Sequence, residues 1–184
     1  MMAEHRQVIT TLAMSLDGYI ADPAGGYGWI SGDGDHSLDT PEKWDFARFL
    51  DGIDLVVMGR GCFDQGQHKD FADKRVWVAT NHPPQGDEQP NLHFVSGDLP
   101  ALLRQESHMP GKDIYIYGGG VLLQQLAAAN VIDRYIIGIV PALLHNGRRL
   151  FPGDAPAAAP HTRLKLEKVI REEGIVILDY RRGE

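Results

Sequence analysis

Cysteine is nearly absent from this sequence, because Cys62 is the single cysteine among 184 residues. One cysteine excludes an intramolecular disulfide and a Cys-x-x-Cys metal site. Long apolar runs are missing too. No stretch approaches the 18 residues that a membrane-spanning helix needs, and the first residues contain no apolar signal-peptide segment. We therefore expect a soluble, cytoplasmic protein with no membrane partner.

Positive charge is also in short supply. The chain has 18 Lys and Arg residues against 25 Asp and Glu residues, which gives a formal net charge of −7. Basic pairs such as Arg148–Arg149 and Arg181–Arg182 are too small to form a stripe that binds nucleic acid. We therefore expect no nucleic-acid partner.

The remaining composition is that of an ordinary globular protein, with 43% hydrophobic and 23% charged residues. A chain of this length can bury a substantial core. No internal repeat is visible in the sequence. We therefore expect residues 1–184 to form a single domain.

Strand-like and helix-like stretches alternate along most of the chain. Runs of β-branched, aromatic and aliphatic residues predict strands at residues 6–14, 53–58, 76–80, 92–95, 113–117 and 132–140. Apolar residues at helical spacing predict helices at 99–107 and 121–131. Two strand-like runs, 162–171 and 175–181, close the chain and are joined by a Glu-Glu-Gly turn. This order predicts an α/β fold: a mixed, mostly parallel sheet flanked by helices, with an antiparallel C-terminal hairpin.

A further helix is expected before the strand at 53–58. Thr40 has a side chain suited to an N-cap, and Pro41 suits the first helical position. Asp51 and Gly52 form a stop signal. We therefore expect this helix to run from Pro41 to about Leu50.

Glycines follow two of the expected strands directly, in VVMGRG at 56–61 and in IYIYGGG at 114–120. Glycine has no Cβ, so the backbone can turn sharply there and another molecule can approach it closely. Backbone N–H groups at such a turn can bind a diphosphate, and a further phosphate suits a planar cation such as Arg60. The two turns therefore predict a phosphate or dinucleotide site. The fingerprint of doubly wound dinucleotide folds is not met, since Leu123 stands where its third glycine belongs.

Candidate metal and hydrolase motifs fail on their spacing. Asp33, Asp35 and Asp39 lie in one loop, but the glycine and glutamate that an EF-hand needs are not at their positions. His68 and Asp70 have no third ligand at metal spacing and are interpreted as surface residues. No G-x-S-x-G motif is present. We therefore expect no metal.

Taken together, the motifs resemble one superfamily. They occur in the order LAMSLDGYIA (12–21), DLVVMGRGCFDQG (54–66), VATNHPP (78–84), IYGGGVLLQQL (116–126) and NGRRLF (146–151). Over nearly the whole chain they are similar to the dihydrofolate reductase-like fold. Within that fold they resemble the reductase domain of bacterial riboflavin-biosynthesis deaminase-reductases. The deaminase half would need a P-C-x-x-C motif, which one cysteine cannot supply.

This resemblance implies NADPH binding at matching positions. Ala13 and Ile20 match residues that flank the nicotinamide, and Thr80 and Asn81 match residues near the adenosine phosphate. The family usually has Thr at the position of Cys62, where a hydroxyl donates to phosphate. The segment around the pyrophosphate and 2′-phosphate matches Gly59, Arg60, Gly61 and Cys62. The glycine turn and helix start beneath the diphosphate match Gly118, Gly119, Gly120, Val121 and Leu122.

On the substrate side, folate reductases place a carboxylate in the helix before VVMGR. Glu42 is the nearest match and is the candidate catalytic residue, and Asp45 is the next candidate. Trp29 matches a position that lines the substrate pocket. Asp17 either contacts substrate or orders its own turn. The arginines at 148–149 either meet a substrate phosphate or are solvated.

The resemblance implies an NADPH-dependent oxidoreductase that transfers hydride to a pyrimidine or pterin-like heterocycle. The most similar activity is that of 5-amino-6-(5-phosphoribosylamino)uracil reductase of riboflavin biosynthesis. Dihydrofolate reductase activity is one alternative, and a non-enzymatic NADPH-binding sensor or assembly module is another. The apolar C-terminal hairpin and the strand at 132–140 predict a homodimer.

Overall fold

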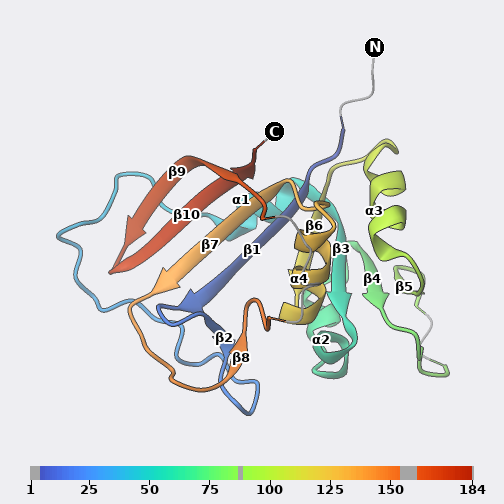
Figure 1. The fold of residues 1–184 in the computed structure, drawn as a ribbon, viewed down its shortest axis with the longest axis horizontal. Helices are drawn as coiled ribbons and strands as arrows, with labels where there is room; N and C mark the ends of the chain where they lie inside the picture. Colours follow the sequence, from blue (N-terminus) through green and yellow to red (C-terminus); the bar gives the residue numbers. More distant parts are fainter. Residues whose placement is uncertain (1–4, 87–88, 154–160, 184) are drawn as a thin grey trace.

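The structure is a computed structural model that describes residues 5–86, 89–153 and 161–183. Its elements follow the alternation expected from the sequence (Figure 1). The strands are β1 (Val8–Ser15), β2 (Tyr19–Ala21), β3 (Ile53–Gly59), β4 (Arg75–Ala79), β5 (Leu92–Val95), β6 (Asp113–Gly118), β7 (Arg134–Val140), β8 (Arg148–Arg149), β9 (Leu164–Glu172) and β10 (Ile175–Arg182). The helices are α1 (Phe46–Asp51), α2 (Arg60–Asp64), α3 (Leu99–Ser107) and α4 (Gly120–Ala128), with a 3₁₀ turn, η1, at Gln67–Phe71.

Eight strands form one sheet in the order β5-β4-β3-β6-β1-β7-β10-β9. From β5 to β7 all neighbours are parallel, whereas β10 pairs antiparallel with both β7 and β9. The expected mixed sheet with an antiparallel C-terminal hairpin is therefore confirmed. The short β2 and β8 pair separately beside it, and the sequence did not predict them.

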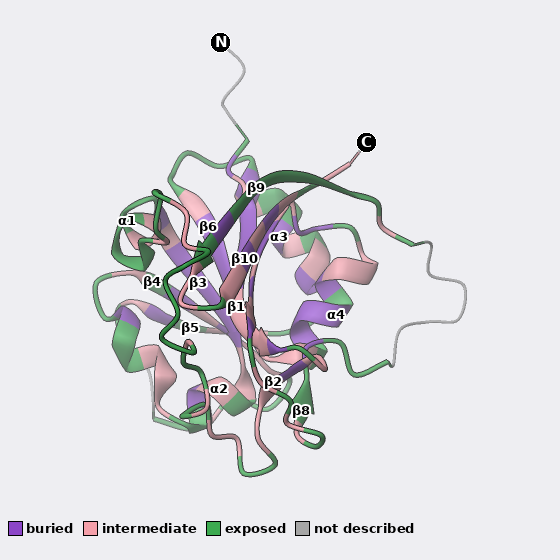
Figure 2. Cartoon of the chain, turned by 90° about the vertical axis from the view of Figure 1, so that its left-hand side faces the viewer, coloured by how far each residue is buried: buried purple, intermediate pink, exposed green. Residues whose placement is uncertain are grey.

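The core lies on both faces of the sheet (Figure 2). The central strand β3 is an uninterrupted apolar run, and Leu55, Val56, Val57 and Met58 are all 0% exposed, as expected of a strand buried on both faces. Buried side chains of α3 and α4 pack on one face. Buried side chains of α2 and η1 pack on the other, with Phe49 of α1 partly buried against them. The sheet is thereby held rigid between two layers.

The helix before β3 begins later than the sequence predicts. Helix α1 starts at Phe46, and Asp45 is its N-cap, accepting a hydrogen bond from the amide of Arg48 at 2.9 Å. Thr40 is bound elsewhere: its hydroxyl accepts from the amide of Arg171 at 3.0 Å, which ties the segment to β9. The expected cap at Thr40 is therefore wrong, because a contact with a distant strand takes that hydroxyl. The predicted stop at Gly52 is confirmed.

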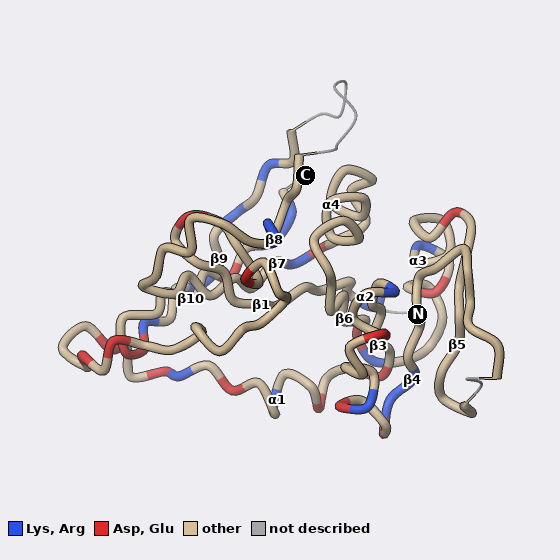
Figure 3. The backbone as a smooth tube through the Cα atoms, turned by 90° about the horizontal axis from the view of Figure 1, so that it is seen from below, with Lys and Arg blue, Asp and Glu red and all other residues tan. Residues whose placement is uncertain are grey.

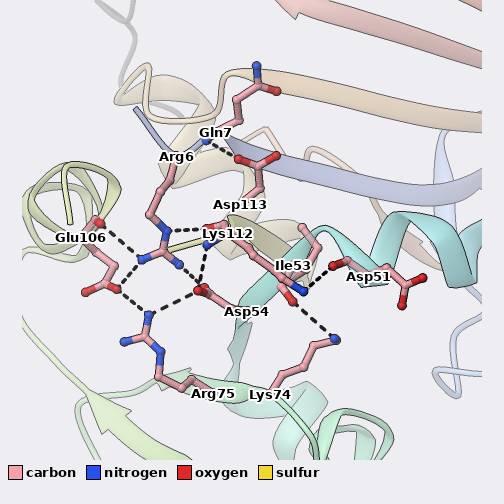
Figure 4. A network of polar contacts seen from close by, with 10 residues as sticks. All are labelled: Arg6, Gln7, Asp51, Ile53, Asp54, Lys74, Arg75, Glu106, Lys112 and Asp113. Carbon is pink, nitrogen blue, oxygen red and sulfur yellow. Dashed lines mark hydrogen bonds and ion pairs between the residues drawn. The ribbon is translucent and has the colours of Figure 1, made fainter. Parts of the chain in front are cut away.

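An ionic network around the buried Arg6 joins the amino ends of the parallel strands (Figure 4). Arg6, whose side chain is 1% exposed, forms ion pairs with Asp54 of β3 and Glu106 of α3. Arg75 at the start of β4 also pairs with Glu106 at 2.6 Å. Burial tends to raise the pKa of Glu106, but hydrogen bonds from Arg75 and Arg6 outweigh it, so this pKa is lowered. This edge of the sheet is thus a structural clamp, opposite the edge where the glycine turns lie.

Candidate active site

The two glycine turns lie side by side at the carboxyl edge of the sheet. Strands β3 and β6 are parallel neighbours, and Met58 pairs with Gly118 at their ends. A Cβ on Gly59 would lie 3.6 Å from the carbonyl oxygen of Gly118 and from the amide nitrogen of Gly119. In open α/β sheets, ligands bind at the carboxyl ends of the strands. The sheet therefore brings both predicted turns to one place.

The first cavity, of about 770 Å³, opens over these turns. It has a wall of bare backbone: Cβ atoms added at Gly61 or Gly119 would meet no described atom within 4 Å. The N-cap residue of helix α4 is Gly119, which has no side chain to cap the helix, and this leaves amide N–H groups of the first turn available to a ligand. The predicted residues that line the first cavity are Gly59, Arg60, Gly61, Cys62, Gly119, Gly120, Val121 and Leu122.

Three arginines line the first cavity, and no acidic residue is among its described lining residues. Arg60 is held in place, since it donates to the Asp64 carboxylate at 2.7 Å and to the His82 carbonyl at 2.6 Å. The other two, Arg148 and Arg149, come from β8. Figure 3 shows basic residues at β8 and near α2, while acidic residues gather along the loop before α1. The first cavity is therefore suited to an anion.

Strand β8 is positioned by the second glycine turn. A Cβ at Gly120 would collide with the carbonyl oxygens of Arg149 and Leu150, so only glycine allows this approach. The Arg149 guanidinium lies over the ring of Tyr19, 4.7 Å from its centroid. The sequence analysis left the roles of the two arginines open, and this packing places both beside the first cavity.

The second cavity, of about 400 Å³, adjoins the first. Both are lined by Cys62, Gln65, Gly119, Gly120 and Arg148. The predicted residues Ala13 and Ile20 line the second cavity, together with Tyr27, Tyr115 and Tyr117. The second cavity therefore has the flat, apolar walls that suit a ring system.

Burial sets the protonation of two groups in this region. It raises the pKa of Tyr117 to about 12, with smaller contributions from Cys62, Tyr27 and Asp70. It also raises the pKa of the Cys62 thiol, so this side chain is a neutral thiol at pH 7. Cys62 therefore offers only a weak S–H donor where the family usually has a hydroxyl.

Other predicted cofactor residues lie near these cavities without lining them. Thr80 directly follows Ala79, which lines the first cavity. The Thr80 hydroxyl accepts a hydrogen bond from the amide of His82 at 3.1 Å, which orders the turn beside Arg60. The described lining residues of the two cavities do not include Thr80, Asn81 or Gly118. The structure thus places these three at the margin of the site.

The candidate acids before β3 are not brought to the glycine turns. Glu42 and Asp45 line a third cavity, of about 400 Å³, between α1 and the C-terminal hairpin. The Glu42 carboxylate is 62% exposed and pairs with Lys168 at 2.8 Å, and Asp45 caps α1. The structure therefore separates both carboxylates from the cavities that hold the other predicted residues.

The two other predicted substrate residues have local contacts. The indole nitrogen of Trp29 donates to the carbonyl of Gly26 at 3.3 Å, within the long loop. Asp17 accepts hydrogen bonds from the Ser15 hydroxyl at 2.6 Å and from the amide of His145 at 2.8 Å. The Ser15 hydrogen bond is the main cause that lowers the pKa of Asp17 to about 2. Of the two roles left open for Asp17, the structure supports ordering of its turn.

Comparison with known proteins assigns the chain to a family. The RibD C-terminal domain family matches residues 65–176, which is more than half of the chain. The chain belongs to the RibD C-terminal domain family. It is 26% identical over 153 residues to the uncharacterized protein YwjB of Bacillus subtilis, a match that covers 79% of this chain and 83% of YwjB. The uncharacterized protein YyaP of the same organism is 27% identical over 161 residues, covering 80% and 81% of the two chains.

Solved structures of this family and fold superpose on nearly the whole chain. One is from Shewanella sp. PV-4 and is described as a riboflavin biosynthesis protein. It superposes with a TM-score of 0.76 and 28% sequence identity, covering 97% of this chain and 99% of that one. The deaminase/reductase of Thermotoga maritima has a TM-score of 0.71 and 15% identity, covering 98% of this chain and 57% of that one. Dihydrofolate reductase of Enterococcus faecalis, complexed with NADP(H), has a TM-score of 0.60 and 16% identity, with 97% of both chains covered. The dihydrofolate reductase-like fold expected from the motifs is confirmed.

Among the described residues, no helix is long and apolar enough to cross a membrane.

Proposed function

We propose that this RibD C-terminal family protein is an NADPH-dependent reductase acting on a pyrimidine or pterin-like heterocycle. The most similar activity is that of 5-amino-6-(5-phosphoribosylamino)uracil reductase. The observation that carries the proposal is the pairing of the two glycine turns inside a cavity lined by three arginines and, among its described residues, by no carboxylate. Family membership and the reductase named in the Thermotoga maritima protein support it.

The residues of the first cavity fit the phosphorylated part of NADPH. Open space beside Gly61 and Gly119 allows a diphosphate to approach the backbone, and amides at the start of α4 can donate to its oxygens. Arg60, held by Asp64, presents a cation for the 2′-phosphate. When bound, NADPH supplies the hydride. The chain itself binds and orients the reactants.

The second cavity fits the acceptor ring because it continues directly from the first. Ala13 and Ile20, which the resemblance matches to residues beside the nicotinamide, line this cavity. The buried ring of Tyr115 and the partly buried ring of Tyr117 restrict water and provide flat surfaces for stacking. Tyr117 keeps its proton at neutral pH, so it is available as a hydrogen-bond donor.

The folate alternative has less support from this geometry. Folate reductases place a carboxylate before the strand that corresponds to β3, and its nearest matches here, Glu42 and Asp45, line the third cavity instead. The likeness to dihydrofolate reductase, at 16% identity, concerns the fold. A pyrimidine substrate is therefore the preferred assignment.

A substrate screen that follows the loss of NADPH absorbance tests the proposal. The ribosylaminopyrimidine phosphate, dihydrofolate and flavin precursors are supplied in parallel. We expect turnover of the pyrimidine. Methotrexate-sensitive turnover of dihydrofolate would instead establish the folate activity, and NADPH binding without consumption of any compound would establish a sensor or assembly module.

A further inference from the structure

The second cavity contains a carboxylate that has no partner among the described residues. Asp70, in η1, is the one acidic side chain among the described residues that line either adjoining cavity. No ion pair or hydrogen bond of its side chain occurs within the described part of the chain. Asp70 is exposed, as the sequence analysis expected of a surface residue, and it lies where η1 borders this cavity.

The position of Asp70 is fixed by its neighbour in sequence. Phe71 is 2% exposed, and its ring packs edge-on against Tyr117 at 5.4 Å and Tyr115 at 6.1 Å. The stacking of His68 on Phe63, with ring centroids 4.5 Å apart, holds the start of η1 against α2. The Asp70 backbone is therefore anchored to the walls of the cavity that it lines, as recognition of a small rigid ligand requires.

Two amide side chains line the second cavity with Asp70. Gln67 donates from Nε2 to Oε1 of Gln65 at 3.3 Å. The Gln67 Oε1 atom is buried and has no hydrogen-bond partner among the described residues. A buried acceptor without a donor is costly, but this atom is covered from solvent and does not itself reach a ligand in the cavity. Of these side chains, the exposed Asp70 therefore supplies the carboxylate acceptors of this cavity.

The cation of the second cavity is contributed by β8. Arg148 lines both cavities, and it is near enough to Cys62 to lower the pKa of that thiol against the effect of burial. A ligand in the second cavity thus meets one carboxylate, from η1, and one guanidinium, from β8. Such a pair suits a ligand that carries both N–H donors and an anionic substituent.

We propose that Asp70 determines substrate specificity, accepting hydrogen bonds from N–H groups of an amino- or imide-bearing heterocycle in the second cavity. This inference rests on the proposed function, since it assigns the acceptor substrate to that cavity. An ionised carboxylate has acceptors and no donor. Rings rich in N–H donors are therefore favoured there, and rings that present only acceptors are rejected because Asp70 would lose its hydration without compensation.

Isothermal titration of 5,6-diaminouracil tests this inference in wild-type protein, in Asp70→Asn and in Asp73→Asn. Asp73 is the matched control, because it lies three residues away, is 76% exposed and lines neither cavity. Each titration is run with and without NADPH, and NADPH affinity is measured separately. We expect Asp70→Asn to weaken 5,6-diaminouracil binding at least about tenfold, with Asp73→Asn and the NADPH affinity unchanged within about twofold.

Several results would overturn the assignment to Asp70. These are no binding of 5,6-diaminouracil to the wild type, equal affinity in all three proteins, or a parallel loss of NADPH affinity in Asp70→Asn. Failure of the proposed function gives a different result. In that case the wild type does not bind NADPH, while the titrations without NADPH still show whether affinity for the heterocycle depends on Asp70.

Discussion

Gly59 and Gly119 lie in contact across two parallel strands. A Cβ on Gly59 would stand 3.6 Å from the amide nitrogen of Gly119, although the two glycines belong to turns separated by some sixty residues in the chain. The relationship follows from the β3–β6 pairing, because parallel neighbours end at the same edge. Two turns that are separately weak signals thereby form one surface of exposed backbone.

Replacement of Gly119 by valine should remove NADPH binding and leave the fold intact. The residue has an extended backbone with φ of −82°, and no described atom lies within 4 Å of a Cβ there, so the new side chain enters the cavity. We expect NADPH affinity to fall at least about tenfold in a fluorescence titration. The contrasting variant, Gly120→Ala, should lower the free energy of unfolding, because its Cβ would meet the Arg149 carbonyl. Unchanged affinity in Gly119→Val would count against the site.

Replacement of Arg60 by alanine should weaken NADPH more than NADH. Only NADPH carries the 2′-phosphate, and charged hydrogen bonds of this kind contribute about 1.5–3 kcal/mol, or roughly ten- to a hundredfold in affinity. Parallel titrations of the two cofactors measure the ratio. Arg48→Ala is the control, since Arg48 lies on α1 and lines the third cavity only. An equal loss for both cofactors would refute this role of Arg60.

Replacement of Cys62 by threonine should strengthen NADPH binding. The half-buried Cys62 remains a thiol and is a poor donor, whereas a threonine hydroxyl at the same position can donate to a phosphate oxygen. We expect affinity to rise by a few-fold, on the order of 1 kcal/mol, measured by the same titration. Cys62→Ser serves as a second hydroxyl variant. Weaker binding in both variants would show that no phosphate lies within reach of this side chain.

The stability of the protein should decline in acid partly through Glu106. Its folded-state pKa is lowered by Arg75 and Arg6, so its contribution is present above the unfolded value of about 4.3 and is lost as the pH falls through the folded value. Urea unfolding at several pH values from neutral to acid should show a steeper loss for the wild type than for Glu106→Gln. The control, Glu167→Gln, removes a partly exposed carboxylate near Lys165. If the free energy of unfolding depends on pH identically in wild type and Glu106→Gln, the ion pairs of Glu106 do not contribute to acid sensitivity.

We propose that the chain forms a homodimer through the C-terminal hairpin. Strand β9 is an edge strand, and its Leu164, Leu166 and Val169 are 42%, 47% and 39% exposed. An edge strand with exposed apolar side chains can pair with another chain, and two-fold dimers are the commonest homo-oligomers. Sedimentation should show a dimer at micromolar concentration that Leu166→Glu dissociates. The same change at Leu38, which is 67% exposed in the long loop, should have no effect. A monomeric mass for the wild type in sedimentation would contradict the proposed homodimer.

The strands of the eight-stranded sheet and both glycine turns could be predicted because their signals are local. A continuous apolar run such as 53–58 reports burial on both faces, and glycines directly after a strand report a sharp turn. The start of α1 could not be predicted in this way. It depends on a hydrogen bond between Thr40 and Arg171, which are 131 residues apart.

Parts of the candidate site also depend on distant contacts. The sequence shows the pair Arg148–Arg149, but only the approach of β8 to Gly120 places it beside the first cavity. Asp70 carries no motif, and its position follows from the packing of Phe71 against two tyrosines. For Glu42, the match by sequence position pointed to a catalytic acid, whereas the structure places it beside Lys168.

A crystal structure of the NADPH complex tests the central claim most directly. The account predicts the diphosphate in contact with backbone amides of the Gly59–Gly61 and Gly119–Leu122 segments, with the 2′-phosphate beside Arg60. An NADPH molecule bound elsewhere, with both turns empty or covered by side chains, would contradict it.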